Sequence, residues 1–215
     1  MVELYSIAYY ILITVVLIIG LIVYLKIAEK WSIIDQPNSR SSHLVVTKRG
    51  GGIIYLIALV IYMISSNFNM PSIIICGLLL GIMGFIDDIK NLDFKIKLIF
   101  QCLTIGYFLS TGSYNGLEWN LLILMFFLII SSINILNFMD GINGLTILYS
   151  LSFLISFYII NAHIIAFTDS NFLLIVILSN LIIGYFNIRK KAVCFLGDVG
   201  AITMGCLLYT SDAAD

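Results

Sequence analysis

The feature that most constrains the fold of this chain is the distribution of its positive charges among long apolar runs. The Lys and Arg residues fall in alternate gaps between these runs, and the other gaps contain none. This alternation follows the positive-inside rule for a protein that crosses a membrane several times. It places the basic gaps, and every prominent polar motif, on the cytoplasmic side. The basic residues are Lys26, Lys30, Arg40, Lys48, Arg49, Lys90, Lys95, Lys97, Arg189, Lys190 and Lys191.

Composition indicates a helical membrane protein and excludes an ordinary soluble domain. Hydrophobic residues make up 61% of the 215 residues and charged residues 11%, and the mean hydropathy is +1.09. The apolar runs are continuous rather than alternating, which favours helices over a β-barrel. A basic cytoplasmic face suits anionic lipid heads and phosphate substrates, whereas nucleic-acid binding is a poor interpretation of so apolar a chain. The four cysteines show no spacing typical of a metal site or a disulfide framework.

We expect an all-α, polytopic transmembrane bundle with seven complete spans and a truncated eighth, and with the N-terminus outside. A span requires roughly 20 apolar residues. Spans are predicted at 5–25, 51–66, 71–86, 96–112, 119–136, 144–162 and 171–187, with the eighth starting near 199. The cytoplasmic segments are then 26–50, 87–95, 137–143 and 188–198, and the external ones are 67–70, 113–118 and 163–170. Without internal repeats or linkers, residues 1–215 are interpreted as one integral-membrane domain.

The end of the sequence fits this pattern poorly. The eighth apolar run begins near Val199 and meets the polar stretch 209–215 after only a few turns. At about 1.5 Å per residue, such a helix crosses about half of a bilayer and would leave Asp212 and Asp215 in the hydrocarbon. We therefore expect a C-terminally truncated sequence in which residues from about 208 to 215 are a non-native tail. Such a fragment is expected to be inactive or weakly active.

The first polar segment combines a turn with basic residues and three consecutive glycines. It reads Asp35-Gln-Pro-Asn38-Ser-Arg40-Ser-Ser-His43, and Arg49-Gly50-Gly51-Gly52 follows. Glycine lets the backbone approach a ligand closely, and successive N–H groups can form an anion-binding nest. With basic side chains nearby, the segment could cradle a phosphate. The alternative is a flexible, basic loop beside the membrane.

The second polar segment carries adjacent carboxylates, Asp87 and Asp88, at the end of a predicted span. Such a pair is costly at the edge of a membrane unless a partner neutralises it. Mg²⁺ is a suitable partner because it binds through one or two carboxylates together with substrate phosphates. The alternative is a solvated helix end, which fits Asp93 better because lysines lie on both sides of it.

The third polar segment ends another apolar run. Asn134, Asn137 and Asp140 recur every three residues and therefore share one helix face, and Gly141 and Gly144 then end the helix. This polar face is predicted to bind a ligand, with a simple polar helix C-cap as the alternative.

The fourth polar segment contains Gly197-Asp198-Val-Gly200 just before the last apolar run. An aspartate between glycines is a further candidate metal ligand. Phe195 could stack on a nucleotide base, although a single Phe is more often a core residue, and the basic residues 189–191 are interpreted mainly as topology anchors. Together the four segments predict a Mg²⁺-assisted phosphate site at the cytoplasmic surface, with Mn²⁺ as a possible substitute.

In this order, the segments resemble the polyprenyl-phosphate N-acetylhexosamine-1-phosphate transferases, a membrane family also termed glycosyltransferase family 4. Phospho-MurNAc-pentapeptide transferase is a relative of that family. The resemblance rests on residues 35–43, 49–52, 87–88, 134–145 and 195–200, and their order covers nearly the whole chain. The Arg-Gly-Gly-Gly form of the first segment is more similar to the N-acetylhexosamine branch.

The resemblance implies an enzyme of the bacterial cytoplasmic membrane with its active site on the cytoplasmic face. It would transfer N-acetylhexosamine-1-phosphate, expected to be GlcNAc-1-phosphate, from a UDP-sugar to undecaprenyl phosphate, release UMP and initiate a cell-envelope polysaccharide. The alternative is the phospho-MurNAc-pentapeptide transferase reaction. The non-enzyme alternatives are a transporter and an inactive scaffold. Carboxylates gathered at one interface rather than near the middle of the bilayer argue against a transporter.

The same resemblance implies roles for individual residues. Asp198 would bind Mg²⁺ directly, with Asp88 or Asp140 assisting, and Asp87 would orient or deprotonate the attacking lipid phosphate. Asn143 stands where the family often has Asp, and the family's His-bearing loop near the C-terminus lies beyond this sequence. The substrate-binding set would be Asn38, Arg40, His43, Arg49, Gly50, Gly51, Gly52, Asn134, Asn137, Asn143, Asn187 and Phe195.

Overall fold

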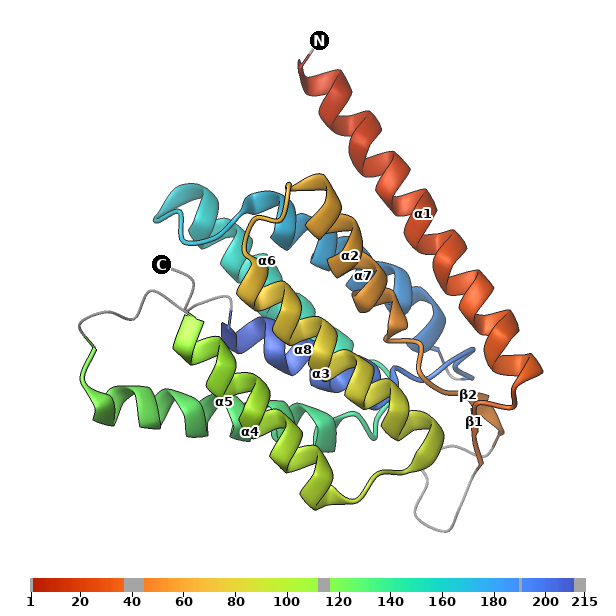
Figure 1. Ribbon diagram of the computed structural model, residues 1–215. Helices are drawn as coiled ribbons and strands as arrows, with labels where there is room; N and C mark the ends of the chain where they lie inside the picture. The colour runs from red at the N-terminus through yellow and green to blue at the C-terminus, as the bar shows by residue number, and fades with distance from the viewer. Residues whose placement is uncertain (1, 37–44, 112–116, 190, 211–215) are drawn as a thin grey trace.

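The computed structural model describes residues 2–36, 45–111, 117–189 and 191–210. Within these residues the regular secondary structure is helical apart from two two-residue strands, with turns and loops between the elements (Figure 1). The prediction of an all-α membrane protein is therefore confirmed. The elements are α1 (Val2–Lys30), β1 (Ile34–Asp35), β2 (Thr47–Lys48), α2 (Ile53–Ser65), α3 (Pro71–Lys90), α4 (Phe94–Thr111), α5 (Trp119–Met139), α6 (Leu145–His163), α7 (Ser170–Asn187) and α8 (Gly197–Thr210).

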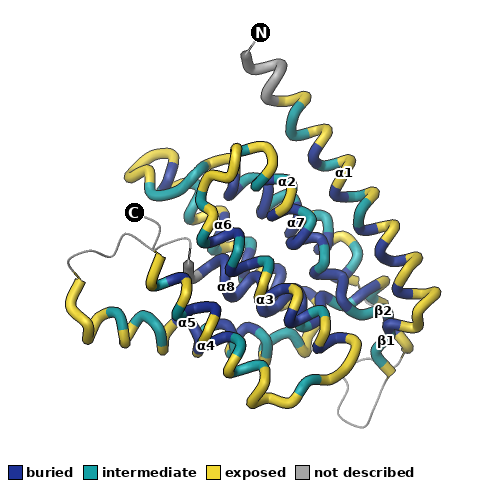
Figure 2. The backbone as a smooth tube through the Cα atoms, viewed as in Figure 1, coloured by how far each residue is buried: buried dark blue, intermediate teal, exposed yellow. Residues whose placement is uncertain are grey.

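Helix α8 forms the centre of the bundle, although it is the last element in the sequence. It packs most extensively against α3 and next against α5. All residues from Val199 to Leu208 are buried, and Figure 2 shows most of α8 in dark blue behind α3. The close approach of α3 depends on glycines, because a Cβ at Gly84 would lie 2.7 Å from the carbonyl oxygen of Asp198. In contrast, α1 lies along one side of the bundle and its N-terminal half extends away from it.

Buried polar pairs join the helices around this centre. The Tyr55 hydroxyl on α2 donates to the amide oxygen of Asn180 on α7 (2.6 Å), and the amide nitrogen of Asn180 donates to the carbonyl of Ile147 on α6 (3.0 Å). The amide of Asn134 on α5 donates to the amide oxygen of Gln101 on α4 (2.8 Å). Hydrogen bonds of this kind fix helix register where the hydrophobic effect between helices is weak.

The predicted number of complete spans is higher than the structure supports. Among the residues that the structure describes, five helices are long and apolar enough to cross a membrane: Ile7–Lys30 within α1, and α3, α5, α6 and α7. Helix α2 has only 13 residues, fewer than the roughly 17 that a span requires. Helix α4 has 18 residues, but it is not among the helices that are apolar enough to cross a membrane. Two lysines, Lys95 and Lys97, lie in its first turn. The chain is a multi-pass membrane protein, but not all of its apolar helices match the bilayer.

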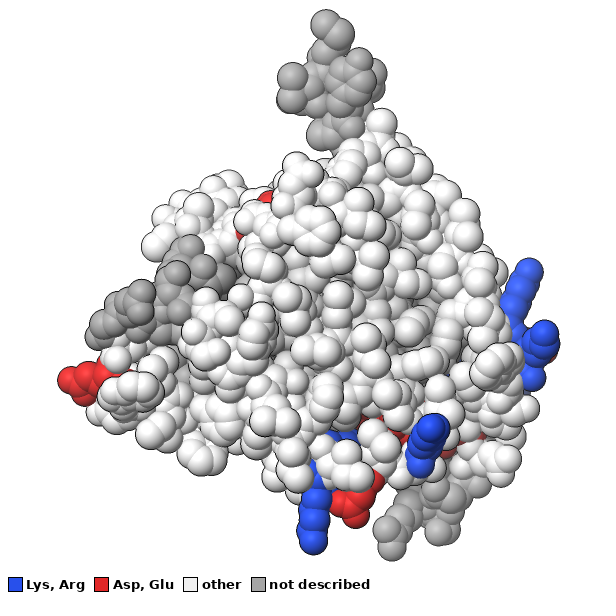
Figure 3. Space-filling model, in the orientation of Figure 1, with Lys and Arg blue, Asp and Glu red and all other residues white. Residues whose placement is uncertain are grey.

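The basic side chains are segregated on the molecule as the sequence predicts. On the face drawn in Figure 3, Lys and Arg atoms lie along the lower and right-hand edges, near the β1–β2 end of the bundle. The upper part of this face shows no Lys or Arg among the described residues. The polar segments that carry the candidate site lie at the same basic end.

Candidate active site

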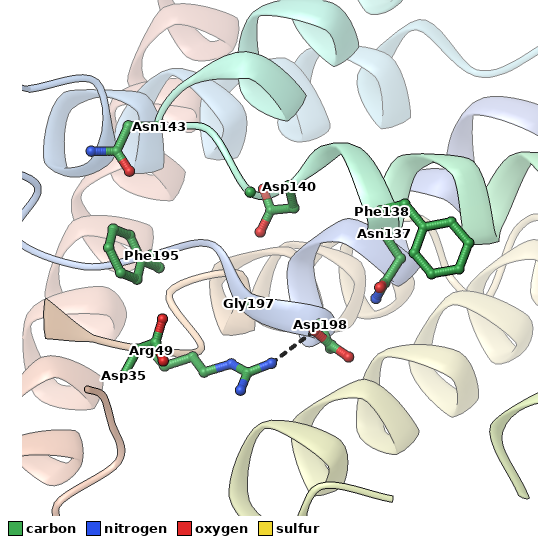
Figure 4. Close-up of a pocket in the computed structure, with 10 residues that line it drawn as sticks. Asp35, Arg49, Asn137, Phe138, Asp140, Asn143, Phe195, Gly197 and Asp198 are labelled. Carbon is green, nitrogen blue, oxygen red and sulfur yellow. Dashed lines mark hydrogen bonds and ion pairs between the residues drawn. The ribbon is translucent and has the colours of Figure 1, made fainter. Parts of the chain in front are cut away.

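A pocket of about 350 Å³ lies at the basic end of the bundle, where segments far apart in the sequence meet (Figure 4). Phe195 and Asn143 lie toward one end of it, Asn137 and Phe138 toward the other, and Asp140 between them. The first, third and fourth polar segments contribute to the lining, and the second lies behind it. The lining residues are Asp35, Arg49, Asn137, Phe138, Asp140, Gly141, Asn143, Phe195, Gly197 and Asp198.

The first and fourth polar segments run side by side through backbone hydrogen bonds. The N–H of Phe195 donates to the carbonyl of Lys48, and the N–H groups of Gly51 and Gly52 donate to the carbonyls of Phe195 and Leu196, each at 2.8 Å. The predicted anion-binding nest is therefore wrong for Gly51 and Gly52, because their N–H groups already have protein partners. These glycines permit close packing instead, since a Cβ on Gly52 would overlap the backbone of Gly200.

Asp88 is fully buried and is bonded on both carboxylate oxygens. Its side chain is 0% exposed. Oδ1 accepts from the N–H of Asp198 (2.9 Å) and pairs with Nε of Arg49 (2.7 Å), and Oδ2 accepts from the N–H of Val199 (3.1 Å). Asp88 therefore joins the last turn of α3, the first turn of α8 and the loop before α2.

Asp198 projects from the first turn of α8 into the pocket and lies between two cations. Its Oδ1 accepts from the guanidinium of Arg49 (2.9 Å, the dashed line in Figure 4), and its Oδ2 is 3.5 Å from Nζ of Lys97. Lys97 also pairs with Oδ2 of Asp87 (2.7 Å), and Oδ1 of Asp87 accepts from the N–H of Leu92 (2.6 Å). The charges of the site thus form one connected network.

Asp140 follows the end of α5 and lies in the middle of the pocket. Burial raises the pKa of its carboxyl group to about 8, and the negative charges of Asp198 and Asp88 act in the same direction. A cation among these carboxylates would favour the charged form of Asp140 instead. The amide nitrogen of Asn137, one turn earlier on α5, is buried and lies beside the carboxylate of Asp198. The pocket therefore holds both an acidic group and a donor suited to a polar ligand.

Two predicted substrate-binding residues lie away from the pocket. Asn134 bonds to Gln101 between α4 and α5. Asn187 is buried, where its amide oxygen accepts from the N–H of Gly144 (2.6 Å) and its amide nitrogen donates to the carbonyl of Cys194 (3.1 Å). Both amides hold protein segments together, and their predicted contact with substrate remains untested. The predicted residues Asn38, Arg40 and His43 lie outside the described residues.

The structure adds residues that were not predicted to belong to the site, namely Asp35, Lys97, Phe138, Gly141 and Gly197. Lys97 could have been assigned to the site from the sequence, because a lysine inside a predicted span usually has a function or a partner. Gly197 has φ +76, a conformation that favours glycine. Asp35 and Phe138 belong to the first and third polar segments, but only the fold shows that they reach the pocket.

The donor set suits a Mg²⁺ ion that is shared with a substrate. Among the described residues, no group of three or more Asp, Glu, His or Cys side chains is placed to hold a metal ion by itself. Mg²⁺ commonly binds through one or two carboxylates and completes its shell with substrate phosphates and water. The carboxylates of Asp198 and Asp140 line the pocket and fit that arrangement.

Comparison of the sequence with known proteins shows the family of the chain. A family model described as Glycosyl transferase family 4 matches residues 70–211, which is more than half of the chain. The chain belongs to glycosyl transferase family 4. The matched residues run from the start of α3 through α8 and include Asp87, Asp88, Asp140 and Asp198.

Curated relatives of this family member act on two kinds of sugar. The chain is similar to a probable undecaprenyl-phosphate N-acetylglucosaminyl 1-phosphate transferase from Bacillus subtilis, with 26% identity over 84% of this chain and 54% of that protein. It is also similar to a phospho-N-acetylmuramoyl-pentapeptide-transferase from Streptococcus gordonii, with 28% identity over 89% of this chain and 68% of the relative. A Streptococcus suis protein of the same name is 31% identical over 63% of this chain and 47% of the relative. The chain thus spans about half to two thirds of the length of these relatives.

Proposed function

We propose that the protein to which this chain belongs is a Mg²⁺-dependent sugar-1-phosphate transferase that acts on undecaprenyl phosphate. The donor would be a UDP-N-acetylhexosamine, most simply UDP-GlcNAc. The reaction would form a bond between an oxygen of the lipid phosphate and the sugar-linked phosphorus of the donor. The bond from that phosphorus to the bridging oxygen would break, and UMP would leave with the electron pair.

The observation that carries this proposal is the convergence of Asp87, Asp198, Arg49 and Lys97 in one network beside the pocket. Transfer of a phosphoryl group between two anions requires charge neutralisation and in-line positioning more than covalent help. A network with both signs of charge can provide this neutralisation and positioning. Its carboxylates can hold a cation, and its basic side chains can donate to phosphate oxygens.

The residues would divide the substrates between them. Asp198, assisted by Asp140, would hold Mg²⁺, which supplies positive charge to the diphosphate of the donor. Arg49 and Lys97 would donate to phosphate oxygens, and Asp87 would orient the attacking lipid phosphate through its pair with Lys97. Phe195 and Asn143, at the far end of the pocket from Asn137, would contact the nucleotide base.

Phospho-MurNAc-pentapeptide transfer is the second candidate, because relatives with that name match this chain with 28% to 31% identity. The chemistry at phosphorus is the same for both candidates. They differ in the sugar, which would extend beyond the diphosphate and therefore beyond the network of charges described above.

A panel of nucleotide sugars tests the proposal. The full-length protein in lipid nanodiscs would be given undecaprenyl phosphate, Mg²⁺ and one of UDP-GlcNAc, UDP-GalNAc or UDP-MurNAc-pentapeptide, and lipid-linked product and UMP would be measured. We expect equal amounts of product and UMP with one donor, and none after addition of EDTA. Formation of UMP without a lipid product, or no turnover with any donor, would contradict the proposal.

A further inference from the structure

The two adjacent aspartates at the end of α3 have different surroundings. Asp87 pairs with Lys97, which also reaches Asp198, whereas Asp88 points toward the first turn of α8. The side chain of Asp88 is 0% exposed and that of Asp198 is 17% exposed. Asp198 lines the pocket and Asp88 does not.

The N–H groups at the start of an α-helix have no partners within the helix and are commonly bonded by a side chain just before it. Helix α8 begins at Gly197, which has no side chain. Asp88, from α3, takes over this function and accepts from the N–H groups of Asp198 and Val199. Its negative charge also lies at the positive end of the helix dipole, where a carboxylate is stabilising.

Asp88 controls the position of Asp198 through two routes. The first is the backbone, because the N–H of Asp198 itself donates to Oδ1 of Asp88. The second is Arg49, whose Nε pairs with Asp88 (2.7 Å) and whose terminal nitrogen pairs with Asp198 (2.9 Å). A displacement of Asp88 would therefore move both the backbone and the cation that orient Asp198.

We infer that Asp88 is a positioning residue that holds the first turn of α8, and Asp198 on it, at the pocket, and that it does not bind the metal ion itself. The three bonds to its oxygens already satisfy a buried carboxylate, and a metal ion would have to replace them. This inference rests in part on the proposed function, since it assigns Asp198 and not Asp88 to the ion.

Gly197 offers an independent way to disturb the same contact. A Cβ at Gly197 would lie 2.5 Å from Oδ2 of Asp88 and 2.8 Å from the backbone nitrogen of Gly50. Gly197→Ala would therefore push Asp88 away from α8 without changing any charge. If Asp88 acts through this contact, Gly197→Ala and Asp88→Asn should have similar effects.

The test uses the full-length protein in nanodiscs, with Mn²⁺ as a paramagnetic substitute for Mg²⁺. Asp88→Asn, Gly197→Ala and Asp198→Asn would be compared for Mn²⁺ bound at saturation, for the electron paramagnetic resonance spectrum of that Mn²⁺, for unfolding temperature and for turnover per bound Mn²⁺. The matched control is Asp93→Asn, because Asp93 is an exposed carboxylate that accepts from the N–H of Lys95 at the start of α4. Asparagine caps the N-terminus of a helix about as well as aspartate does, so this substitution should change little.

We expect Asp88→Asn and Gly197→Ala to bind Mn²⁺ at saturation, with an altered spectrum and a lower unfolding temperature. Their turnover per bound Mn²⁺ should fall by about 10- to 100-fold, the usual effect of losing a group that orients a ligand. Asp198→Asn should lose Mn²⁺ binding and keep its unfolding temperature, and Asp93→Asn should resemble wild type. Counting turnover per bound ion separates misplacement of Asp198 from a smaller number of folded molecules.

Loss of Mn²⁺ binding in folded Asp88→Asn would overturn the inference, because it would identify Asp88 as a ligand of the metal ion. Unchanged turnover per bound Mn²⁺ with an unchanged spectrum would overturn it as well, because the role would then be structural only. If Asp88→Asn does not fold, Gly197→Ala decides by the same criteria. If wild type transfers no sugar phosphate, the proposed function fails, and the Mn²⁺ spectrum still decides the role of Asp88.

Discussion

The charged residues of the pocket differ in how far their partners fix them. Asp88 has three donors and no exposure, whereas Asp198 is partly exposed between Arg49 and Lys97. The ion pairs of Asp198 are held mainly by charge. A phosphate or a cation that enters the pocket can compete for these partners. The residues with exchangeable partners are therefore the ones we expect to contact substrate.

Lys97 provides a direct test at this scale. Lys97→Met keeps much of the side-chain length but removes the cation that lies between Asp87 and Asp198. Transfer of sugar phosphate should fall by about 100-fold, as expected when a group that stabilises transition-state charge is lost. Lys95→Met is the control, because Lys95 is exposed, and it should retain most of the activity in the same radiolabelled-sugar assay. Similar losses in both variants would instead indicate a general effect of basic charge.

Two asparagines of the predicted substrate-binding set should respond differently to substitution. Asn187→Ala leaves the N–H of Gly144 and the carbonyl of Cys194 without partners. Each such buried group costs about 1–3 kcal/mol, so the unfolding temperature should fall clearly. Asn143→Ala, at an exposed position in the pocket, should leave the unfolding temperature unchanged and raise KM for the nucleotide sugar. A normal unfolding temperature for Asn187→Ala would refute its structural role.

The acidic candidates could be picked out from the sequence, because a carboxylate beside an apolar run is conspicuous. Asp140 and Asp198 line the pocket, and their roles in metal binding and catalysis stay predictions. The distinction between Asp87 and Asp88 was not predictable, since adjacent residues on a helix point in different directions and their partners lie on other elements. For the same reason Asn134 and Asn187 were grouped with Asn137, although only Asn137 lines the pocket.

At the scale of helices, contact between α3 and α8 depends on small residues. A Cβ at Gly84 would lie 2.7–2.8 Å from the backbone of Asp198 and Val199. No side-chain movement can relieve this overlap, because the atoms belong to backbone. The helices approach closely here, and this approach brings Asp88 within reach of the first N–H groups of α8.

Gly84→Ala should therefore destabilise the protein, although alanine is the better helix former. Overpacking typically costs about 1–3 kcal/mol, against a gain of about 1 kcal/mol from helix propensity. Gly106→Ala in α4 is the matched control, because nothing lies within 4 Å of a Cβ there, and it should be neutral or slightly stabilising. Thermal unfolding in nanodiscs measures both changes. Equal unfolding temperatures for the two variants would show that the α3–α8 contact can shift at little cost.

Helix positions were predicted within a few residues, because continuous apolar runs mark them directly. The predicted span 119–136 corresponds to α5, Trp119–Met139, and 171–187 to α7, Ser170–Asn187. The central position of α8 was not predictable, since the apolar composition of a membrane helix does not distinguish a lipid-facing from a protein-facing surface. The short length of α2, 13 residues, was likewise not marked by hydropathy, which predicted a span over 51–66.

At the scale of the whole molecule, the basic end defines how the protein should sit in the membrane. The pocket lies at this end, with Lys48, Arg49 and Lys97 near it. From the positive-inside rule we expect the pocket to face the cytoplasm. A cytoplasmic pocket would meet a soluble nucleotide sugar directly and a lipid phosphate at the membrane surface.

Cysteine labelling from each side of the membrane checks this orientation. Lys30→Cys, at the end of α1, and Glu118→Cys, just before α5, place exposed thiols at the two ends of the bundle. In inside-out vesicles an impermeant maleimide should label Lys30→Cys, and in intact cells it should label Glu118→Cys. Wild type is the control, because three of its four cysteines are buried. Labelling of both variants from the same side would overturn the proposed topology.

The central place of α8 also determines the order in which the protein can assemble during synthesis. Helices α2, α3 and α5 leave the ribosome before α8, so their contacts with α8 form only after α8 has been made. Until then, Asp88 lacks its backbone donors, and Asp198 has not yet been made. The charged network therefore forms only after α8 has joined the bundle, because α8 supplies both Asp198 and the backbone donors to Asp88.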